Sequence, residues 1–351
     1  MMLRTTVRSP VATFAAIALE LMLLLTPLGT AAQTYTNPVL DVNFPDPTAL
    51  RVGGTMYAYG TGQDASQAGP AKYIAMTKST DLRNWTPAAM VLILPAWATG
   101  DTWAPHVVKD PGQASRYVMY FSAKGYRAHP DVPDDADKCI GVAVSTSPDG
   151  PFTAQPAPLI CGSGGREIDP FAFYDQNESK WFLFWGSGSN VPMSRRQLST
   201  DLLTFASGST AVDVISAIPG NKYSSLVEGA WVLDRGAYRY LFMSGKHCCM
   251  GDDDYAVTVA RKPLSNLSGP WVRYAGGDNG AILKMNATWR APGHNGIFVD
   301  GAGQHWIIYH ARRPNMPNKR VLMMDRITWQ DDWPRIAGDS PSTGATAAPI
   351  P

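Results

Sequence analysis

The sequence predicts an all-β protein, a five-bladed β-propeller, from three observations. An aromatic-rich alternating segment recurs five times, a second alternating segment follows each copy, and a short apolar segment precedes each copy. Alternation of this kind, bounded by turns rich in Gly, Pro, Asn and Asp, is typical of β-strands, and no long segment of helical period competes with it. A repeat of about sixty residues that holds about four short strands has the size of a propeller blade.

The aromatic-rich segments are regularly spaced. Their marker residues are 60, 64, 57 and 68 residues apart, in the order Tyr57, Tyr117, Trp181, Tyr238 and Trp306. The segments that follow are 74–79, 141–145, 196–199, 256–260 and 321–325, and those that precede are 48–50, 106–108, 171–173, 230–233 and 296–299. A β-sandwich or a pair of small β-domains is the alternative, and the regular repeat weighs against both.

The preceding segments carry the candidate functional residues. Aligned on the turn that ends each segment, the position six residues back is, in order, Asp46, Ala104, Asp169, Glu228 and His294. Because the innermost strands of a propeller surround its central channel, we expect equivalent positions to converge on the axis. Asp-Pro at Asp46 and Asp169 is also a common turn opener, but that explanation does not cover Glu228.

Three converging carboxylates suit the hydrolysis of a glycosidic bond. This reaction needs an acid that protonates the leaving oxygen and a second carboxylate on the other face of the sugar. The acid must keep its proton although an ordinary Glu titrates near a pKa of about 4.3. A third carboxylate raises the pKa of the acid, because two like charges in a poorly solvated cleft repel.

The chain resembles glycoside hydrolase family 43, whose members are inverting five-bladed propellers that act on arabinan, arabinoxylan and xylan. The resemblance covers about residues 35 to 335. The resembling segments are 37–40 with 44–47, Thr102-Trp103-Ala104-Pro105-His106, Ile168-Asp169-Pro170, Val227-Glu228-Gly229 and Pro292-Gly293-His294-Asn295. It implies cleavage of α-L-arabinofuranosyl linkages, with a xylan-acting β-xylosidase as the alternative and a non-catalytic carbohydrate-binding propeller as a third possibility.

The resemblance also implies roles for single residues. Asp46 resembles the general base, Glu228 the general acid, and Asp169 the residue that orients the acid and raises its pKa. His294 resembles an axial histidine beside a bound ion; a calcium ion with mostly water ligands would fit there, and a histidine without metal is the alternative. No cofactor is expected to be required for the chemistry.

Four further residues are candidates for holding the sugar. Phe44 and Trp103 neighbour axial positions and would stack on sugar faces, while Arg290 and Arg312 flank strands of the fifth repeat and would bond hydroxyl groups. Packing between blades is the alternative role for the aromatic side chains. A fructan hydrolase is disfavoured, because its nucleophile motif is Asn-Asp-Pro-Asn and its acid is followed by Cys, whereas Gly229 follows Glu228 here.

Composition limits the partners and the location. Thirty basic and 29 acidic side chains give a net charge of +1, which argues against nucleic acid as a partner. Residues 1–32 are expected to be a signal peptide, with a membrane anchor as the alternative, and residues 33–336 the catalytic propeller. Residues 337–351 are expected to be a flexible tail. The expected location is therefore secreted or periplasmic, with plant cell-wall saccharide as the partner and no membrane after cleavage of the signal.

Four cysteines in an exported chain are expected to be oxidised. Cys139 and Cys161 flank one predicted hairpin and could bridge it, and Cys248 and Cys249 are adjacent and could form a vicinal disulfide. The sequence leaves the connectivity open.

Overall fold

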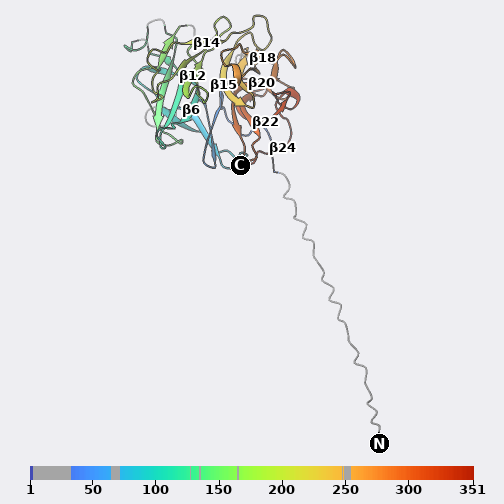
Figure 1. Cartoon of the computed structure of the whole chain (residues 1–351). Helices are drawn as coiled ribbons and strands as arrows, with labels where there is room; N and C mark the ends of the chain where they lie inside the picture. The colour runs from blue at the N-terminus through green and yellow to red at the C-terminus, as the bar shows by residue number, and fades with distance from the viewer. Residues whose placement is uncertain are drawn as a thin grey trace. The chain divides into compact units, whose positions relative to one another are not determined.

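A computed structural model describes residues 1–2, 33–64, 72–126, 128–133, 136–163, 166–246, 248 and 254–351. Residues 33–351 form one compact unit (Figure 1). The expected signal peptide, apart from residues 1–2, lies outside the described residues. Within the described part, no helix has the length and apolar character needed to cross a membrane.

The described part of the chain is all-β, and most of its strands belong to four-stranded antiparallel runs. The first run is β2 (Thr48–Val52), β3 (Thr55–Asp64), β4 (Lys72–Ser79) and β5 (Ala89–Ile93). The second is β6 (Ala98–Lys109), β7 (Tyr117–Gly125), β8 (Lys138–Ser145) and β9 (Phe152–Ala154). The third is β11 (Phe171–Asp175), β12 (Lys180–Trp185), β13 (Met193–Gln197) and β14 (Val212–Ile215). The fourth is β15 (Glu228–Arg235), β16 (Tyr238–Gly245), β17 (Ala256–Pro263) and β18 (Val272–Arg273). The fifth is β20 (Arg290–Val299), β21 (His305–Arg312), β22 (Arg320–Gln330) and β23 (Trp333–Arg335).

A few short elements supplement these runs. The outer strands β5 and β9 pair in parallel, which joins the first two runs into one sheet. Additional strands are β10 (Ile160–Gly162) beside β8, β19 (Ala281–Leu283) beside β17, and β1 (Thr34–Tyr35) beside β24 (Thr346–Ala347). Two 3-10 turns occur in the described chain, at Leu264–Asn266 and Ala337–Asp339.

The aromatic-rich segments occupy the second strand of each run, which explains their repeat. Several place a buried tyrosine on this strand, and each hydroxyl donates to an oxygen outside the strand. Tyr120 donates to the Leu202 carbonyl at 2.7 Å, Tyr240 to the Asp332 carbonyl at 2.6 Å, and Tyr309 to Asp325 Oδ2 at 2.5 Å. A buried tyrosine combines a large apolar surface with a polar group that must be satisfied. In the runs that carry it, this tyrosine therefore meets a packing requirement and a hydrogen-bonding requirement together.

The C-terminal segment, expected from its composition to be flexible, makes defined backbone contacts. β24 pairs with β1, and the Ala348 amide donates to the Gln33 carbonyl at 2.8 Å. The Gly301 amide donates to the Ile350 carbonyl at 2.7 Å. Composition misses these contacts because backbone groups make them, and backbone groups are independent of side-chain type.

Residues near the start of the compact unit also bond to its last run. The Val39 amide donates to the Leu322 carbonyl at 3.0 Å, and the Phe44 amide donates to the Arg320 carbonyl at 2.7 Å. The segment that leads to Asp46 is thereby fixed against β22.

Cys139 and Cys161 form a disulfide between the paired strands β8 and β10. Cys248 is also disulfide-bonded, and Cys249 lies outside the described residues.

Candidate active site

A left-handed backbone position recurs within or just before the first strand of each run. Its residues and φ angles are Asp46 (55°), Ala104 (45°), Asp169 (59°), Gly229 (62°) and His294 (48°). Residues other than glycine rarely adopt this conformation, so its recurrence marks a shared local geometry. In the fourth run the position belongs to Gly229, one residue after the one aligned from the sequence. A register shift in β15 between Glu228 and Trp231 accompanies this offset.

The absence of a side chain at Gly229 also affects how closely the fourth and fifth runs approach. A Cβ atom built there would lie 3.2 Å from Nδ1 of His294. The missing side chain lets the backbone of the fourth run approach the imidazole of the fifth, and it leaves Glu228 as the side chain that the fourth run contributes at this point.

A set of hydrogen bonds connects the runs around these positions. In each case a side chain in or just after the second strand of one run bonds the left-handed residue of the next run or, in the fourth run, the residue before it. The Ala104 amide donates to Thr61 Oγ1 at 2.9 Å, the Asp169 amide to Ser122 Oγ at 3.0 Å, and the His294 amide to Ser244 Oγ at 2.8 Å. Ser187 Oγ donates to Glu228 Oε2 at 2.7 Å. The Asp46 amide donates to His310 Nδ1 at 3.1 Å. Because the last bond joins the fifth run to the first, the bonds form a closed ring.

The ring surrounds a cavity of about 240 Å³. Its lining residues are Asp46, Trp103, Ile168, Asp169, Glu228, Cys248, His294 and Arg320. The three carboxyl groups predicted from the sequence therefore meet in one cavity, although 182 residues separate the first from the last. Asp46 and Asp169 are buried, and Glu228 is partly exposed.

Asp46 lies in a cationic environment. Arg320 Nη1 donates to its Oδ1 at 2.9 Å, and Thr61 Oγ1 donates to its Oδ2 at 2.7 Å. Burial alone would raise the pKa of this carboxyl. Arg320, with smaller contributions from His294 and His310, outweighs burial and holds the pKa of Asp46 well below its usual value. Asp46 is therefore ionised at neutral pH.

Asp169 and Glu228 have the opposite tendency. Burial raises the pKa of Asp169, and the charges of Glu228 and Asp46 raise it further. Burial also raises the pKa of Glu228, although the hydroxyl groups of Tyr255 and Ser187 oppose this by donating to its two oxygens at 2.6 and 2.7 Å. The Gly229 amide donates to Asp169 Oδ2 at 3.2 Å and so links the two acids through the backbone.

One cavity thus contains a carboxyl group whose pKa is lowered beside two carboxyl groups whose pKa values are raised by burial. An ionised carboxylate can accept a proton from water, and a protonated one can donate to a departing oxygen. This arrangement supports acid–base hydrolysis of a glycosidic bond.

Comparison with known proteins agrees with this chemistry. The family model described as "Glycosyl hydrolases family 43" matches residues 35–334. The chain belongs to glycosyl hydrolase family 43.

Individual relatives differ in their substrates. Extracellular endo-alpha-(1->5)-L-arabinanase 1 of Bacillus subtilis is 25% identical over 306 residues, covering 82% of this chain and 86% of the relative. Beta-D-galactofuranosidase xynD of Aspergillus niger is 28% identical over 313 residues, covering 84% and 82%. The solved structure of a thermostable family-43 glycoside hydrolase superposes with a TM-score of 0.72 at 24% identity, covering 91% of this chain and all of that one. The structural likeness shows the fold.

Of the two aromatic residues expected to hold the sugar, one lines the cavity and the other does not. Trp103 lines the cavity, and the Lys138 ammonium lies 3.2 Å from the centroid of its ring. Phe44, by contrast, is fully buried, and its ring lies against the backbone of Gly60. Phe44 therefore packs in the core, where no sugar can stack on it.

The two expected arginines also lie outside the cavity lining. Arg290 and Arg312 face each other as paired residues of β20 and β21, and Arg290 bonds the Asn286 carbonyl. Arg312 is buried. The guanidinium group that does reach the cavity is that of Arg320, at the start of β22.

Sequence reasoning missed the residues that support the carboxyl groups. Thr61, Ser187 and His310 are each a polar residue that follows an aromatic-rich segment. This signal recurs in every repeat and was available in the sequence. Arg320 and Tyr255 carry no such repeat signal, because they come from the third strand of the fifth run and from just before the third strand of the fourth run.

The surroundings of His294 bear on the expected calcium ion. Its Nδ1 lies 3.6 Å from Asp46 Oδ1 and 3.8 Å from Asp169 Oδ2. Among the residues that the structure describes, no group of three or more His, Cys, Asp and Glu side chains is arranged to hold a metal. A single imidazole is a poor donor set for calcium, which prefers oxygen ligands. The described residues do not fit an ion held by protein ligands, and an ion held mostly by water stays a prediction.

Proposed function

We propose that this chain is an inverting glycoside hydrolase that cleaves α-L-arabinofuranosyl linkages of arabinan or arabinoxylan. The observation that carries the proposal is the split in protonation within one cavity, where the pKa of Asp46 is lowered and the pKa values of Asp169 and Glu228 are raised.

We infer that the antiparallel runs are the five blades of a propeller and that its axis passes through the cavity. The closed ring of hydrogen bonds supports this inference, because it joins each run to the next and the fifth to the first. In such an arrangement the first strand of each blade is the innermost, and one residue from each blade reaches the axis.

In the proposed reaction Asp46 is the general base. It removes a proton from a water molecule that attacks the anomeric carbon, while Arg320 and Thr61 hold the two carboxylate oxygens in place. Glu228 is the general acid and gives its proton to the leaving oxygen. It is the most exposed of the three carboxyl groups, which suits a group that must reach the bond between two sugars.

Asp169 is proposed as the residue that positions the acid. Its carboxyl accepts from the amide that follows Glu228, so it fixes the backbone from which the acid projects. Because an inverting enzyme activates water between the sugar and its base, this mechanism places the acid and base carboxyls about 6.5–9.5 Å apart.

The choice of an arabinofuranosyl substrate rests on the relatives. One is named for endo action on α-1,5-L-arabinan and another for β-D-galactofuranosides. An α-L-arabinofuranosyl ring and a β-D-galactofuranosyl ring have the same ring configuration and differ in one exocyclic carbon. A furanosyl site is therefore the specificity that the two names share, and a β-xylosidase is the alternative within the family.

The test is a panel of p-nitrophenyl glycosides with linear arabinan. We expect turnover of the α-L-arabinofuranoside or of linear arabinan to exceed that of the β-D-xyloside and the β-D-galactofuranoside. Proton NMR of the first product, recorded before mutarotation, is expected to reveal the inverted anomer. Preference for the xyloside would favour the β-xylosidase, a retained anomer would refute the mechanism, and binding without cleavage across the panel would favour a carbohydrate-binding propeller.

Residues 1–32 are proposed as a cleaved export signal. Two curated relatives that match most of this chain are named as extracellular enzymes, which supports export. N-terminal sequencing of the mature protein is expected to begin near Gln33, and a mature chain that retains residues 1–32 would refute the proposal.

A further inference from the structure

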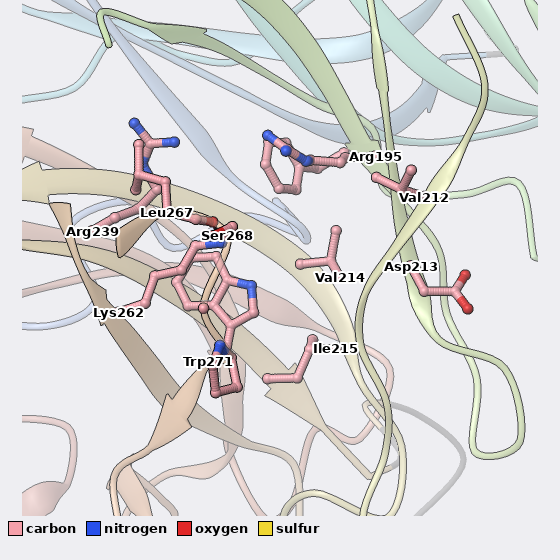
Figure 2. Close-up of a pocket in the computed structure, with 13 residues that line it drawn as sticks. Arg195, Val212, Asp213, Val214, Ile215, Arg239, Lys262, Leu267, Ser268 and Trp271 are labelled. Carbon is pink, nitrogen blue, oxygen red and sulfur yellow. Dashed lines mark hydrogen bonds between the residues drawn. The ribbon is translucent and has the colours of Figure 1, made fainter. Parts of the chain in front are cut away.

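A second pocket lies between the third and fourth runs and shares no lining residue with the catalytic cavity. Its volume is about 410 Å³, within the range of small-molecule sites. Outer strands build it: β13 and β14 contribute one wall, and β17 with residues 267–271 contributes the other (Figure 2).

Cationic side chains dominate the charge of this pocket. Arg195, Arg239 and Lys262 line it, against a single acidic lining residue, Asp213. The Asp213 side chain is exposed, and in Figure 2 its carboxylate points away from Lys262 and Trp271. The pocket itself therefore presents positive charge.

The three cations differ in how well they are neutralised. Arg239 is buried and paired with both Asp175 and Asp234, so its charge is balanced within the protein. Arg195 lies 3.8 Å from Glu178 and stacks over the Phe182 ring. Glu178 is therefore a distant counter-charge that neutralises Arg195 only weakly.

Lys262 is the least neutralised of the three. Its Nζ donates to the Leu267 carbonyl at 2.6 Å, and no carboxylate of the described residues forms a salt bridge with it. Burial lowers the pKa of Lys262 to about 8, and the neighbouring charges of Arg195 and Arg239 contribute to this. A lysine ammonium has three protons to donate, so two stay available to a ligand.

Beside these charges the pocket also has an apolar surface. Trp271 forms one side, with the Lys262 ammonium 4.7 Å from the centroid of its ring, and Val214 and Ile215 lie across from it (Figure 2). A ligand that fits must therefore combine an anionic group with a ring that has an apolar face. A simple inorganic anion would use the cations and leave the apolar wall without a contact.

We propose that this pocket binds a carboxylate-bearing sugar, a hexuronate unit of an acidic polysaccharide. Its carboxylate accepts hydrogen bonds from Lys262 and Arg195, and its pyranose ring packs on the wall formed by Trp271. The choice of a saccharide rests on the proposed function, since a hydrolase of cell-wall polysaccharide meets such units beside its substrate. The pocket then holds the enzyme on acidic chains while the catalytic cavity cleaves neutral ones.

The test is calorimetric titration of the whole mature protein with a short oligogalacturonate. The matched probe is the methyl-esterified oligomer, which has the same rings without the charge. We expect the ester to bind at least about tenfold more weakly than the acid, because Lys262 and Arg195 then have no carboxylate of the ligand to pair with. Equal affinity for the two probes, or no binding of the acid, would overturn the proposal.

Variants locate the binding. Lys262→Met keeps the apolar stem and removes the charge, and Arg195→Met does the same on the other wall. Each is expected to weaken oligogalacturonate binding about tenfold. Lys222→Met is the control, because Lys222 is a lysine outside the pocket that lies near Asp278. Unchanged affinity in both pocket variants, or equal loss in the control, would contradict the assignment.

The outcome is separable from the proposed hydrolysis. Binding is measured without turnover, and Lys262→Met is expected to leave the cleavage of p-nitrophenyl arabinofuranoside unchanged. Hydrolysis without uronate binding would refute the pocket alone, and uronate binding without hydrolysis would refute the proposed reaction alone.

Discussion

Two walls of the same cavity shift the pKa of a carboxyl group in opposite directions. On the wall formed by the first and fifth runs, Asp46 receives a hydrogen bond from a guanidinium group and another from a hydroxyl group. On the wall formed by the third and fourth runs, Asp169 and Glu228 lie close to each other and receive hydrogen bonds from neutral donors alone among the contacts described.

Burial alone therefore does not set the protonation state of these carboxyl groups. All three carboxyls experience burial as the largest influence, and it raises each pKa. The nearby cation reverses the result for Asp46, whereas like charges reinforce it for Asp169. A base and an acid can therefore coexist in a space of about 240 Å³.

The largest expected effect comes from removing either titrating group. Asp46→Asn and Glu228→Gln are each expected to lower kcat/KM by about 10³-fold or more, since each removes one partner of a general acid–base pair. Initial rates on linear arabinan measure this. Asp41→Asn is the control, because Asp41 is an exposed carboxylate in the same segment that pairs with Arg313. Activity near the normal level in either cavity variant, with the melting temperature unchanged, would exclude the assigned role.

A smaller effect is expected from removing the cation. Arg320→Met is expected to raise the pKa of Asp46, because the carboxylate loses its adjacent positive charge. The sign follows from the folded state: with a higher pKa the base becomes protonated at a higher pH, so the acidic limb of the kcat/KM profile moves upward.

Two further variants serve as controls for Arg320→Met. Arg320→Lys retains a positive charge and is expected to shift the acidic limb less. Arg313→Met removes an arginine that pairs with the exposed Asp41 and is expected to leave the profile unchanged. An acidic limb that stays in place in Arg320→Met would mean that other groups set the charge of the base.

The smallest effect is expected from Tyr255→Phe on the opposite wall. The Tyr255 hydroxyl lowers the pKa of Glu228 by donating to Oε1, so its loss raises that pKa and moves the basic limb to higher pH. We expect a change of a few-fold in kcat, in line with one neutral hydrogen bond of about 1 kcal/mol. Tyr223→Phe is the matched variant, since this buried tyrosine bonds Asp278 outside the cavity. A downward shift of the basic limb would contradict the account.

The comparison also explains what the sequence could and could not predict. The carboxyl groups were predictable because they repeat: each lies six residues before the turn that ends a first strand. The offset at Gly229 did not spoil the prediction, because the neighbouring Glu228 still projects into the cavity.

The groups that set the protonation states were harder to predict. Arg320 reaches Asp46 from β22, 274 residues away along the chain, and no repeat relates the two. Phe44 was misjudged for a related reason. Proximity in sequence to an axial residue does not fix the direction of a side chain, and this ring turns into the core beside Gly60.

The central claim is the opposite protonation of the two walls, and carbon-13 NMR titration of the labelled carboxyl groups tests it most directly. Resonances are assigned by their loss in Asp46→Asn, Asp169→Asn and Glu228→Gln. We predict that Asp46 stays ionised well below the ordinary aspartate pKa of about 3.9. Glu228 is predicted to take up its proton at a pH above the ordinary glutamate pKa of about 4.3. An Asp46 that titrates at or above its ordinary value, or a Glu228 that stays ionised below its own, would contradict the account.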